Sequence, residues 1–177
     1  MIFRETPLLG AYTITLEPSR DDRGFFARTY CEYEFKNRGL LPCLAQCNIS
    51  YNRCRGTLRG MHYQIAPYSE AKLVTCLIGA VYDVIIDLRP ESPTYRQWFG
   101  VELSGGHTRS MLYVPKHFAH GFQTLKDDTE VFYQMSEFYH PECASGIRWD
   151  DPAFKISWPP ATRILSQKDR SYPDFIS

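Results

Sequence analysis

Short runs of strand-forming residues, separated by turn residues, fill the middle of this 177-residue chain. Valine, isoleucine, leucine and aromatic residues make up the runs, and glycine pairs, prolines or polar clusters interrupt them. Because no long amphipathic segment lies between the runs, they favour an all-β fold, an antiparallel β-sandwich or jelly-roll barrel, over a parallel sheet. The pattern predicts strands at 58–64, 72–78, 81–89, 98–104, 109–114, 120–125 and 129–137.

Helix signals are few. We expect short helices at 32–38, ended by Gly39, and just after Ser166. The chain has no internal repeat, low-complexity tract or linker, and its length suits one well-buried domain. We therefore assign residues 1–177 to a single domain.

One strand pairing is predicted from a turn alone. Only Lys126-Asp127-Asp128, a polar cluster, separates the runs 120–125 and 129–137. Such spacing is typical of a hairpin, so we expect these two strands to pair with each other.

Several predicted strand faces mix polar with apolar side chains. Alternate residues of a strand share a face, which places His62 with Gln64, and Asp83 with Ile85. Burying such polar groups without partners costs about 1–3 kcal/mol each. A partly polar interior therefore indicates a barrel mouth that holds a ligand.

Charge and composition exclude some partners. Lysine plus arginine equals aspartate plus glutamate, 20 against 20, so no long-range field favours nucleic acid or an anionic membrane. No apolar run approaches the roughly 20 residues that span a bilayer. Aromatic residues make up 15% of the chain, which favours strands and supplies flat faces for a base or a sugar.

The six cysteines form no Cys-x-x-Cys pair, and no charged-then-apolar leader precedes Arg4. We interpret them as reduced thiols of a cytoplasmic protein. Cys43 and Cys47 lack the second Cys or His pair of a tetrahedral metal site.

Side chains that can do chemistry gather in two segments, 46–64 with Lys72, and 115–122. The first brings a histidine, a guanidinium, side-chain amides and an ammonium together. Any one of these residues alone is more often a satisfied core group or a solvated charge. Their clustering predicts a functional site.

The order of motifs along the chain is more specific. They are Arg23-Gly24-Phe25-Phe26, Gln46-x-Asn48-x-Ser50, Leu58-Arg59-Gly60-x-His62-Tyr63-Gln64, Lys72-Leu73-Val74, Asp83-Val84, Asp87-Leu88-Arg89, Ser92-Pro93-Thr94, Ala119-His120-Gly121-Phe122, Gly146-Ile147-x-Trp149-x-Asp151-Pro152, Trp158-Pro159 and Ser166-x-Lys168-Asp169. Over essentially its whole length the chain resembles the dTDP-4-dehydrorhamnose 3,5-epimerase family.

The resemblance implies a cupin-like fold and a cofactor-free epimerase that acts on a nucleotide-linked 4-keto-6-deoxyhexose. The pathway implied is deoxysugar synthesis for cell-surface polysaccharide such as the lipopolysaccharide O-antigen. The chemistry agrees, because the C4 carbonyl acidifies the protons on C3 and C5. Inversion then needs a base, an acid on the opposite face of the ring, and a cation for the enolate oxygen. The reaction is redox-neutral, and the chain has no Gly-x-Gly-x-x-Gly site for a nicotinamide.

The resemblance also implies roles for residues. His62 would be the base, Asp169 the carboxylate that orients it, Tyr133 the acid and Lys72 the enolate stabiliser. Asp169 has a plain alternative, since Ser166-x-x-Asp169 also suits a helix cap. The implied substrate-binding residues are Arg23, Phe26, Gln46, Asn48, Arg59, His120, Tyr139 and Lys168, with Asp83 supporting His120.

Within that set, the cations Arg23, Arg59 and Lys168 would hold the diphosphate. Phe26 and Tyr139 would sandwich the nucleobase. In a regular strand the side chain at 59 points away from the one at 62. Arg59 therefore reaches the site only if Gly56 or Gly60 makes a bulge.

Two positions depart from the family pattern. Arg28 and Ala144 stand where the family commonly carries acids in its nucleotide-contacting part. A CDP- or GDP-linked sugar therefore stays open as an alternative, as does inversion at C3 alone.

Two other functional classes also stay open. A metal-dependent cupin enzyme would carry His-x-His, whereas here Gln64 follows His62 and Lys72 adds a positive charge, so we expect no metal. A non-catalytic sugar-binding module would not need Tyr133, Lys72 and Asp169 together.

We expect a homodimer. Exposed sheet edges favour pairing, and the first 30 residues hold short β-like runs at 12–16 and 25–30. The resemblance implies exchange of this segment, so that Arg23 and Phe26 would serve the neighbour's site.

Overall fold

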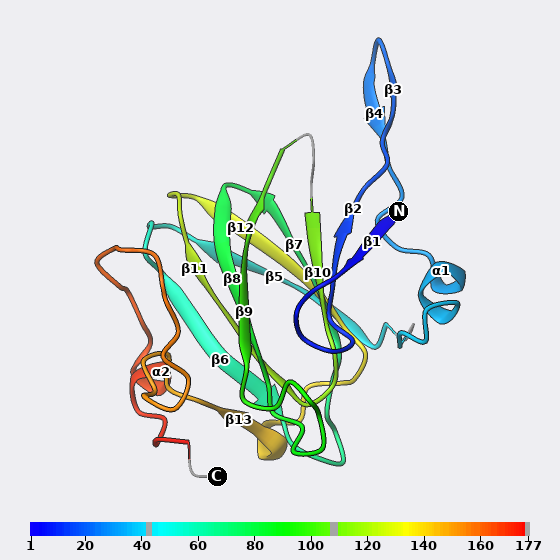
Figure 1. Ribbon diagram of the computed structural model, residues 1–177. Coiled ribbons are helices and arrows are strands. Elements are labelled where there is room, and N and C mark those ends of the chain that lie inside the picture. The colour runs from blue at the N-terminus through cyan, green and yellow to red at the C-terminus, as the bar shows by residue number, and fades with distance from the viewer. Residues whose placement is uncertain (42–43, 107–109, 176–177) are drawn as a thin grey trace.

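The computed structural model describes residues 1–41, 44–106 and 110–175, and it consists mainly of two antiparallel β-sheets (Figure 1). The six-stranded sheet has the order β1 (Ile2–Glu5), β2 (Tyr12–Thr15), β10 (Ser110–Val114), β7 (Lys72–Ile78), β12 (Thr129–Met135) and β5 (Gln46–Asn52). The five-stranded sheet has the order β13 (Ala144–Gly146), β6 (Leu58–Gln64), β11 (Phe118–Thr124), β8 (Ala80–Asp87) and β9 (Trp98–Ser104). The predicted all-β sandwich is confirmed.

The remaining elements are short. A separate hairpin of β3 (Ser19–Asp21) and β4 (Gly24–Phe26) projects from the sheets near the N-terminus (Figure 1). The helices are α1 (Glu32–Lys36), a 3-10 turn at Pro141–Cys143, and α2 (Gln167–Arg170). None of the described helices is long and apolar enough to cross a membrane.

Strand alternation determines which residues form the core between the sheets. On β8, Val81 and Ile85 belong to the central cluster, while Val84 and Ile86 point to the other side. Val131 on β12 is also fully buried in the central cluster. Burying one such aliphatic side chain stabilises the fold by about 1.5–3 kcal/mol, so this two-residue period fixes the sheet faces.

Each sheet is also covered on its outer side. Phe35 of α1 packs with Leu73 and Met111 on the six-stranded sheet. The C-terminal segment covers the five-stranded sheet, where Ile147 and Phe154 pack with residues of β8. This second covering layer brings α2 next to β6.

Asp151 fastens the C-terminal segment to itself. Its buried carboxylate accepts hydrogen bonds from the backbone N–H of Ala153 at 2.8 Å and of Phe175 at 2.6 Å. One side chain thus joins the start of the segment to its far end, beyond α2.

The predicted hairpin of β11 with β12 is wrong. β11 pairs with β6 and β8, whereas β12 pairs with β5 and β7, so the turn at 126–128 carries the chain from one sheet to the other. The polar cluster does form a turn, in which Asp128 has φ 49° and the Thr129 hydroxyl donates to the Lys126 carbonyl. A polar turn marks where a strand ends, but it does not determine which strand becomes the partner.

A buried charge cluster ties the end of β8 to the following loop. The fully buried Asp87 carboxylate accepts hydrogen bonds from Arg89 Nη2 at 2.7 Å, Ser92 Oγ at 2.6 Å and Thr94 Oγ1 at 2.7 Å. Burial raises the pKa of Asp87, but these hydrogen bonds more than offset it and hold the pKa below its usual range. The ionised carboxylate therefore stabilises the native state.

We expect Asp87→Asn to lower the free energy of unfolding at pH 7 by roughly 2–4 kcal/mol, because Arg89 loses its buried partner. Since the native pKa is lowered, the charged group stabilises the fold above about pH 4 and its contribution disappears as pH falls through the native pKa. Urea unfolding from pH 7 to pH 3 measures both effects. Asp150→Asn, which removes an exposed ion pair with Arg148, is the matched control and should change stability by less than about 0.5 kcal/mol. An equal loss in both variants would contradict the prediction.

Candidate active site

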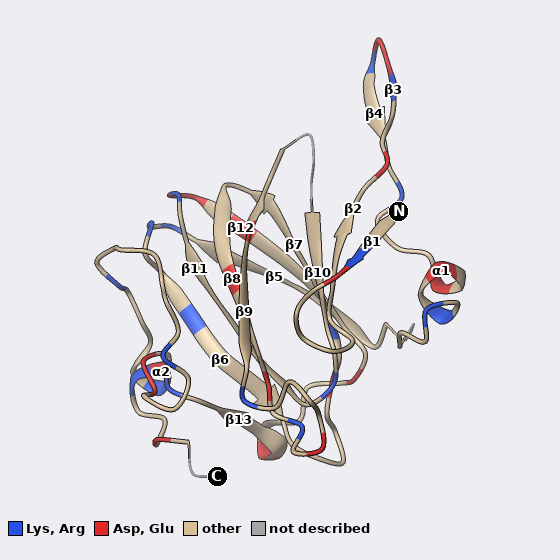
Figure 2. Ribbon diagram, in the orientation of Figure 1, with Lys and Arg blue, Asp and Glu red and all other residues tan. Residues whose placement is uncertain are grey.

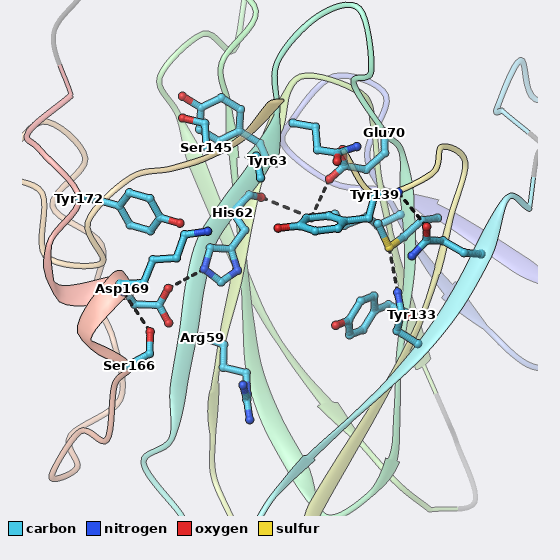
Figure 3. Close-up of a pocket in the computed structure, with 17 residues that line it drawn as sticks. Arg59, His62, Tyr63, Glu70, Tyr133, Tyr139, Ser145, Ser166, Asp169 and Tyr172 are labelled. Carbon is cyan, nitrogen blue, oxygen red and sulfur yellow. Dashed lines mark hydrogen bonds and ion pairs between the residues drawn. The ribbon is translucent and has the colours of Figure 1, made fainter. Parts of the chain in front are cut away.

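A cavity of about 490 Å³ opens between the two sheets and is bordered by α2 (Figure 3). Most of the side chains that the sequence singled out line it. They are His62, Tyr133, Asp169, Lys72, Gln46, Asn48, Arg59, Tyr139 and Lys168.

His62 and Asp169 form the closest polar contact in this cavity. His62 on β6 lies with its Nε2 2.6 Å from Oδ1 of Asp169, which α2 presents (Figure 3). Burial raises the pKa of Asp169, but the hydrogen bond to His62 and the bond with Ser166 outweigh it, so the pKa lies below its ordinary value. An ionised partner on one ring nitrogen leaves the other, Nδ1, to take a proton, and it stabilises the imidazolium that forms.

Asp169 takes part both in the helix cap and in the contact with His62. Its backbone N–H donates to Ser166 Oγ at 3.0 Å, which is the helix cap that Ser166-x-x-Asp169 suggested. Its carboxylate also contacts His62. The cap thus fixes the residue that holds the histidine.

A bulge at Gly60, one of the two glycines that could form it, brings Arg59 into the cavity. In the β6–β11 pairing, His120 faces His62 but Phe122 faces Arg59, so two steps on β11 match three on β6. At Gly60, φ is 138° and an added Cβ would lie 2.5 Å from the Cα of Gly121, so only glycine fits there. The extra residue turns Arg59 to the same face as His62.

Tyr133 faces His62 from the opposite sheet. It lies on β12, whereas His62 lies on β6, and Figure 3 shows the two rings on different sides of the cavity. Burial raises the pKa of the Tyr133 phenol, while the nearby Arg59 charge lowers it. The hydroxyl therefore stays protonated at neutral pH, and a cation is close enough to favour its anion.

Lys72 is held by a carboxylate that the sequence analysis missed. Its Nζ lies 3.1 Å from Glu70 Oε1 and donates to the His62 carbonyl at 3.4 Å. Both side chains are almost fully buried, and Glu70 Oε2 has no hydrogen-bond partner among the described residues. An acid two places before a strand lysine gives no sequence signal of burial, since such pairs are usually solvated.

The cavity also carries side-chain amides and an aromatic ring. Asn48 Nδ2 contacts Met135 Sδ at 3.3 Å, and Gln46 Oε1 accepts from the backbone N–H of Tyr139 at 2.8 Å. Lys168 lines the cavity from α2. Figure 2 shows basic residues on both α2 and β6, two of the elements that line the cavity.

His120 and Asp83 form a buried pair and are not among the described residues that line the cavity. His120 Nε2 lies 3.0 Å from Asp83 Oδ1, and both residues are buried. His120 lies opposite His62 in the register of β11 with β6. The predicted contact of His120 with the substrate stays a prediction.

Arg23, Phe26 and Arg28 lie away from the cavity of their own chain. The first two belong to the projecting β3–β4 hairpin, where Phe26 is 79% exposed and Arg23 pairs with Asp21. Arg28 lies 3.5 Å from Glu34, next to Phe26 around a second cavity of about 230 Å³. Ala144, the other departure from the family pattern, does line the main cavity.

Tyr63, Ser145 and Tyr172 also line the cavity and were missed. Burial raises the pKa of the Tyr172 hydroxyl, and the Asp169 charge adds to the effect. Its ring packs so closely on Gly146 that a Cβ there would lie 2.3 Å away. The Gly146-Ile147 motif was the available signal, since a glycine of this kind marks close approach by another group.

Among the described residues, no three His, Cys, Asp or Glu side chains gather as a metal site. Cys31, Cys47, Cys54, Cys76 and Cys143 are free thiols. Cys43 lies outside the described residues.

Comparison with known proteins shows the family to which the chain belongs. The family profile described as dTDP-4-dehydrorhamnose 3,5-epimerase matches residues 5–177. The chain belongs to the dTDP-4-dehydrorhamnose 3,5-epimerase family. It is an epimerase of the isomerase class.

Individual relatives cover most of the chain. The dTDP-4-dehydrorhamnose 3,5-epimerase of Sinorhizobium fredii is 44% identical, over 86% of this chain and 78% of its own. The enzyme of that name from Methanothermobacter thermautotrophicus is 43% identical, over 96% of this chain and 92% of its own. The crystal structure of the Bacillus anthracis dTDP-4-dehydrorhamnose 3,5-epimerase, with TDP and pyrophosphate bound, is 41% identical with a TM-score of 0.94, and the match covers 98% of this chain and 99% of that one.

We expect Lys72→Met to lower the free energy of unfolding by about 3–5 kcal/mol, because Glu70 is left as an unpaired buried charge. In the double variant Lys72→Met/Glu70→Gln most of that stability should return. Epimerase activity should be lost in the single variant and should stay lost in the double variant. Chemical unfolding and turnover, measured on the same preparations, separate the two roles of Lys72. A double variant as unstable as Lys72→Met would contradict the pairing.

Proposed function

We propose that this epimerase inverts C3 and C5 of a dTDP-linked 4-keto-6-deoxyhexose by proton removal and return. The observation that carries the proposal is the placement of His62 and Tyr133 on facing sheets with Lys72 in the same cavity. The names of the relatives support the dTDP-linked substrate. Metal-free catalysis follows from the same arrangement, because the Lys72 ammonium supplies the positive charge that an enolate needs.

The proton transfers balance within the site. His62 Nδ1 takes the proton from the carbon next to the carbonyl, and the electron pair moves to the C4 oxygen. Lys72 has two of its protons directed to Glu70 and to the His62 carbonyl, which leaves the third for that oxygen. Tyr133 then gives its proton to the opposite face of the carbon. Proton exchange of the tyrosinate and the imidazolium with water restores both groups.

The nucleotide is proposed to lie toward Arg59, Lys168 and Tyr139. The two cations suit a diphosphate, and the half-exposed Tyr139 ring offers a face for the base. A second copy of the chain would complete this end with Arg23 and Phe26. The projection of both residues from their own domain supports a homodimer with exchanged hairpins.

Two further statements belong to the same proposal. We place the enzyme in the cytoplasm, where its free thiols stay reduced. We assign its product to deoxysugar synthesis for a cell-surface polysaccharide such as the lipopolysaccharide O-antigen.

The test of the chemistry is proton NMR in deuterium oxide. We expect His62→Asn to abolish deuterium uptake at both C3 and C5, because one base removes every proton. Tyr133→Phe should retain uptake but suppress inversion, since the proton leaves and cannot return from the far face. Equal loss of both signals in Tyr133→Phe would show that the two faces are assigned wrongly.

The same measurement, repeated with the CDP-linked sugar in competition, tests the substrate. A higher kcat/KM for the dTDP-linked sugar supports the proposal, and a higher value for the CDP-linked sugar supports the alternative suggested by Arg28 and Ala144. Deuterium at C3 alone would restrict the activity to 3-epimerisation.

The composite site is tested with mixed dimers. One subunit carries His62→Asn and the other carries Arg23→Ala with Phe26→Ala, each with a different affinity tag. If the hairpin serves the neighbour, the heterodimer has one intact site and should show about half of the wild-type activity. If each chain uses its own hairpin, both sites carry a defect and activity stays near that of the parent variants.

A further inference from the structure

Gln64 is a buried polar residue that the proposed chemistry does not use. It lies two residues after His62 on β6, lines the cavity and is only 4% exposed. Its Nε2 donates to the Tyr68 carbonyl at 2.8 Å and to the Phe138 carbonyl at 3.1 Å. Its Oε1 accepts from the His140 N–H at 2.6 Å.

All three hydrogen bonds of this side chain go to main-chain groups. An amide nitrogen has two protons to donate, and both are used here. Gln64 therefore has no proton left to give to a substrate, although it lines the cavity. Its place in the site is better explained by the main-chain segments that it binds.

The segment held by Gln64 flanks Tyr139. Gln64 bonds Phe138 and His140, the residues on either side, and Gln46 Oε1 accepts from the Tyr139 N–H at 2.8 Å. Two glutamine side chains, one from each sheet, thus bind three consecutive residues. The Tyr68 ring adds to this by stacking on the His140 ring at 3.5 Å.

No β-ladder fixes this segment. β12 ends at Met135, and residues 138–140 belong to neither strand nor helix. The Tyr139 side chain is 54% exposed, so core packing does not determine its direction either. The hydrogen bonds from the glutamines supply the order that the secondary structure does not.

We propose that Gln64 is a positioning residue that holds Tyr139 in the orientation needed to stack on the nucleobase. This inference rests on the proposed role of Tyr139 in nucleotide binding. Stacking of a base on an aromatic side chain strengthens binding, and a preordered ring avoids the entropic cost of ordering it on binding. Because His62 and Gln64 occupy one face of one strand, about 7 Å apart, β6 places the base catalyst and the nucleobase platform at a fixed separation.

Two substitutions test the role of Gln64. Gln64→Glu keeps the shape but removes both donors and sets a carboxylate against two carbonyl oxygens. Gln64→Leu removes every hydrogen bond. We expect the Kd for dTDP and the KM for the sugar nucleotide to rise about tenfold in both variants, whereas kcat for deuterium uptake at saturating substrate should change less than about threefold.

Gln123→Leu is the matched control. Gln123 is also fully buried, and its Nε2 also donates to a main-chain carbonyl, that of Pro159, at 3.0 Å. It should lose thermal stability to a similar extent and keep its affinity for dTDP. A loss of affinity in this control equal to that in the Gln64 variants would overturn the inference, because general loosening of the fold would then explain both.

A double-mutant cycle with Tyr139→Ala, read by calorimetric titration with dTDP, decides the route of the effect. If Gln64 acts through Tyr139, then Gln64→Leu should weaken binding no further once the ring is gone. If Tyr139→Ala weakens binding and the Gln64 variants do not, or if the two losses simply add, the positioning role is wrong. If Tyr139→Ala leaves the Kd unchanged, the proposed role of Tyr139 fails first and the inference fails with it.

Discussion

The extra residue in β6 at Gly60 is the constraint on which the site depends. Without it, Arg59 would point away from the cavity, because strand side chains alternate. The extra residue brings Gly60 so close to Gly121 that there is almost no space for a Cβ at either position. The bulge forms because both residues are glycines, which have no Cβ. Two glycines on neighbouring strands thus determine that a guanidinium and the His62 imidazole share one cavity.

The two sheets contribute different side chains to the cavity. His62 and Arg59 come from the five-stranded sheet, while Tyr133 and Lys72 come from the six-stranded one. In the proposed mechanism, the reacting sugar therefore meets a base from one sheet and an acid from the other. Neutralising partners lie behind the reactive groups, Asp169 behind His62 and Glu70 behind Lys72. Each partner is buried, so solvent screens these interactions little.

Local patterns in the sequence predicted what depends on local rules. The strands 58–64, 72–78 and 98–104 have the predicted bounds, because apolar alternation and glycine turns are local signals. The bulge that turns Arg59 inward was recognised only as a condition, since Gly56 or Gly60 could form it while regular alternation directs Arg59 to the opposite face. The hairpin prediction for 120–125 with 129–137 was wrong, since pairing partners are decided by packing between distant segments.

Parts of the site escaped prediction for a similar reason. Glu70 carries no periodic or motif signal, and its burial arises only when other segments fold over it. Gln64 was noticed, but only as a residue that replaces a metal ligand. Its three bonds to residues that lie 4, 74 and 76 positions away become visible only in the folded chain.

The clamp that Asp151 forms with Phe175 has a consequence for how His62 obtains its carboxylate partner. The sheets are complete by Gly146, yet Asp169 lies beyond them, on a four-residue helix within the clamped segment. The carboxylate that contacts His62 therefore depends on a segment that belongs to neither sheet. The packing and the clamp of that segment, and not the strand pairing that positions the histidine, determine whether the pair forms.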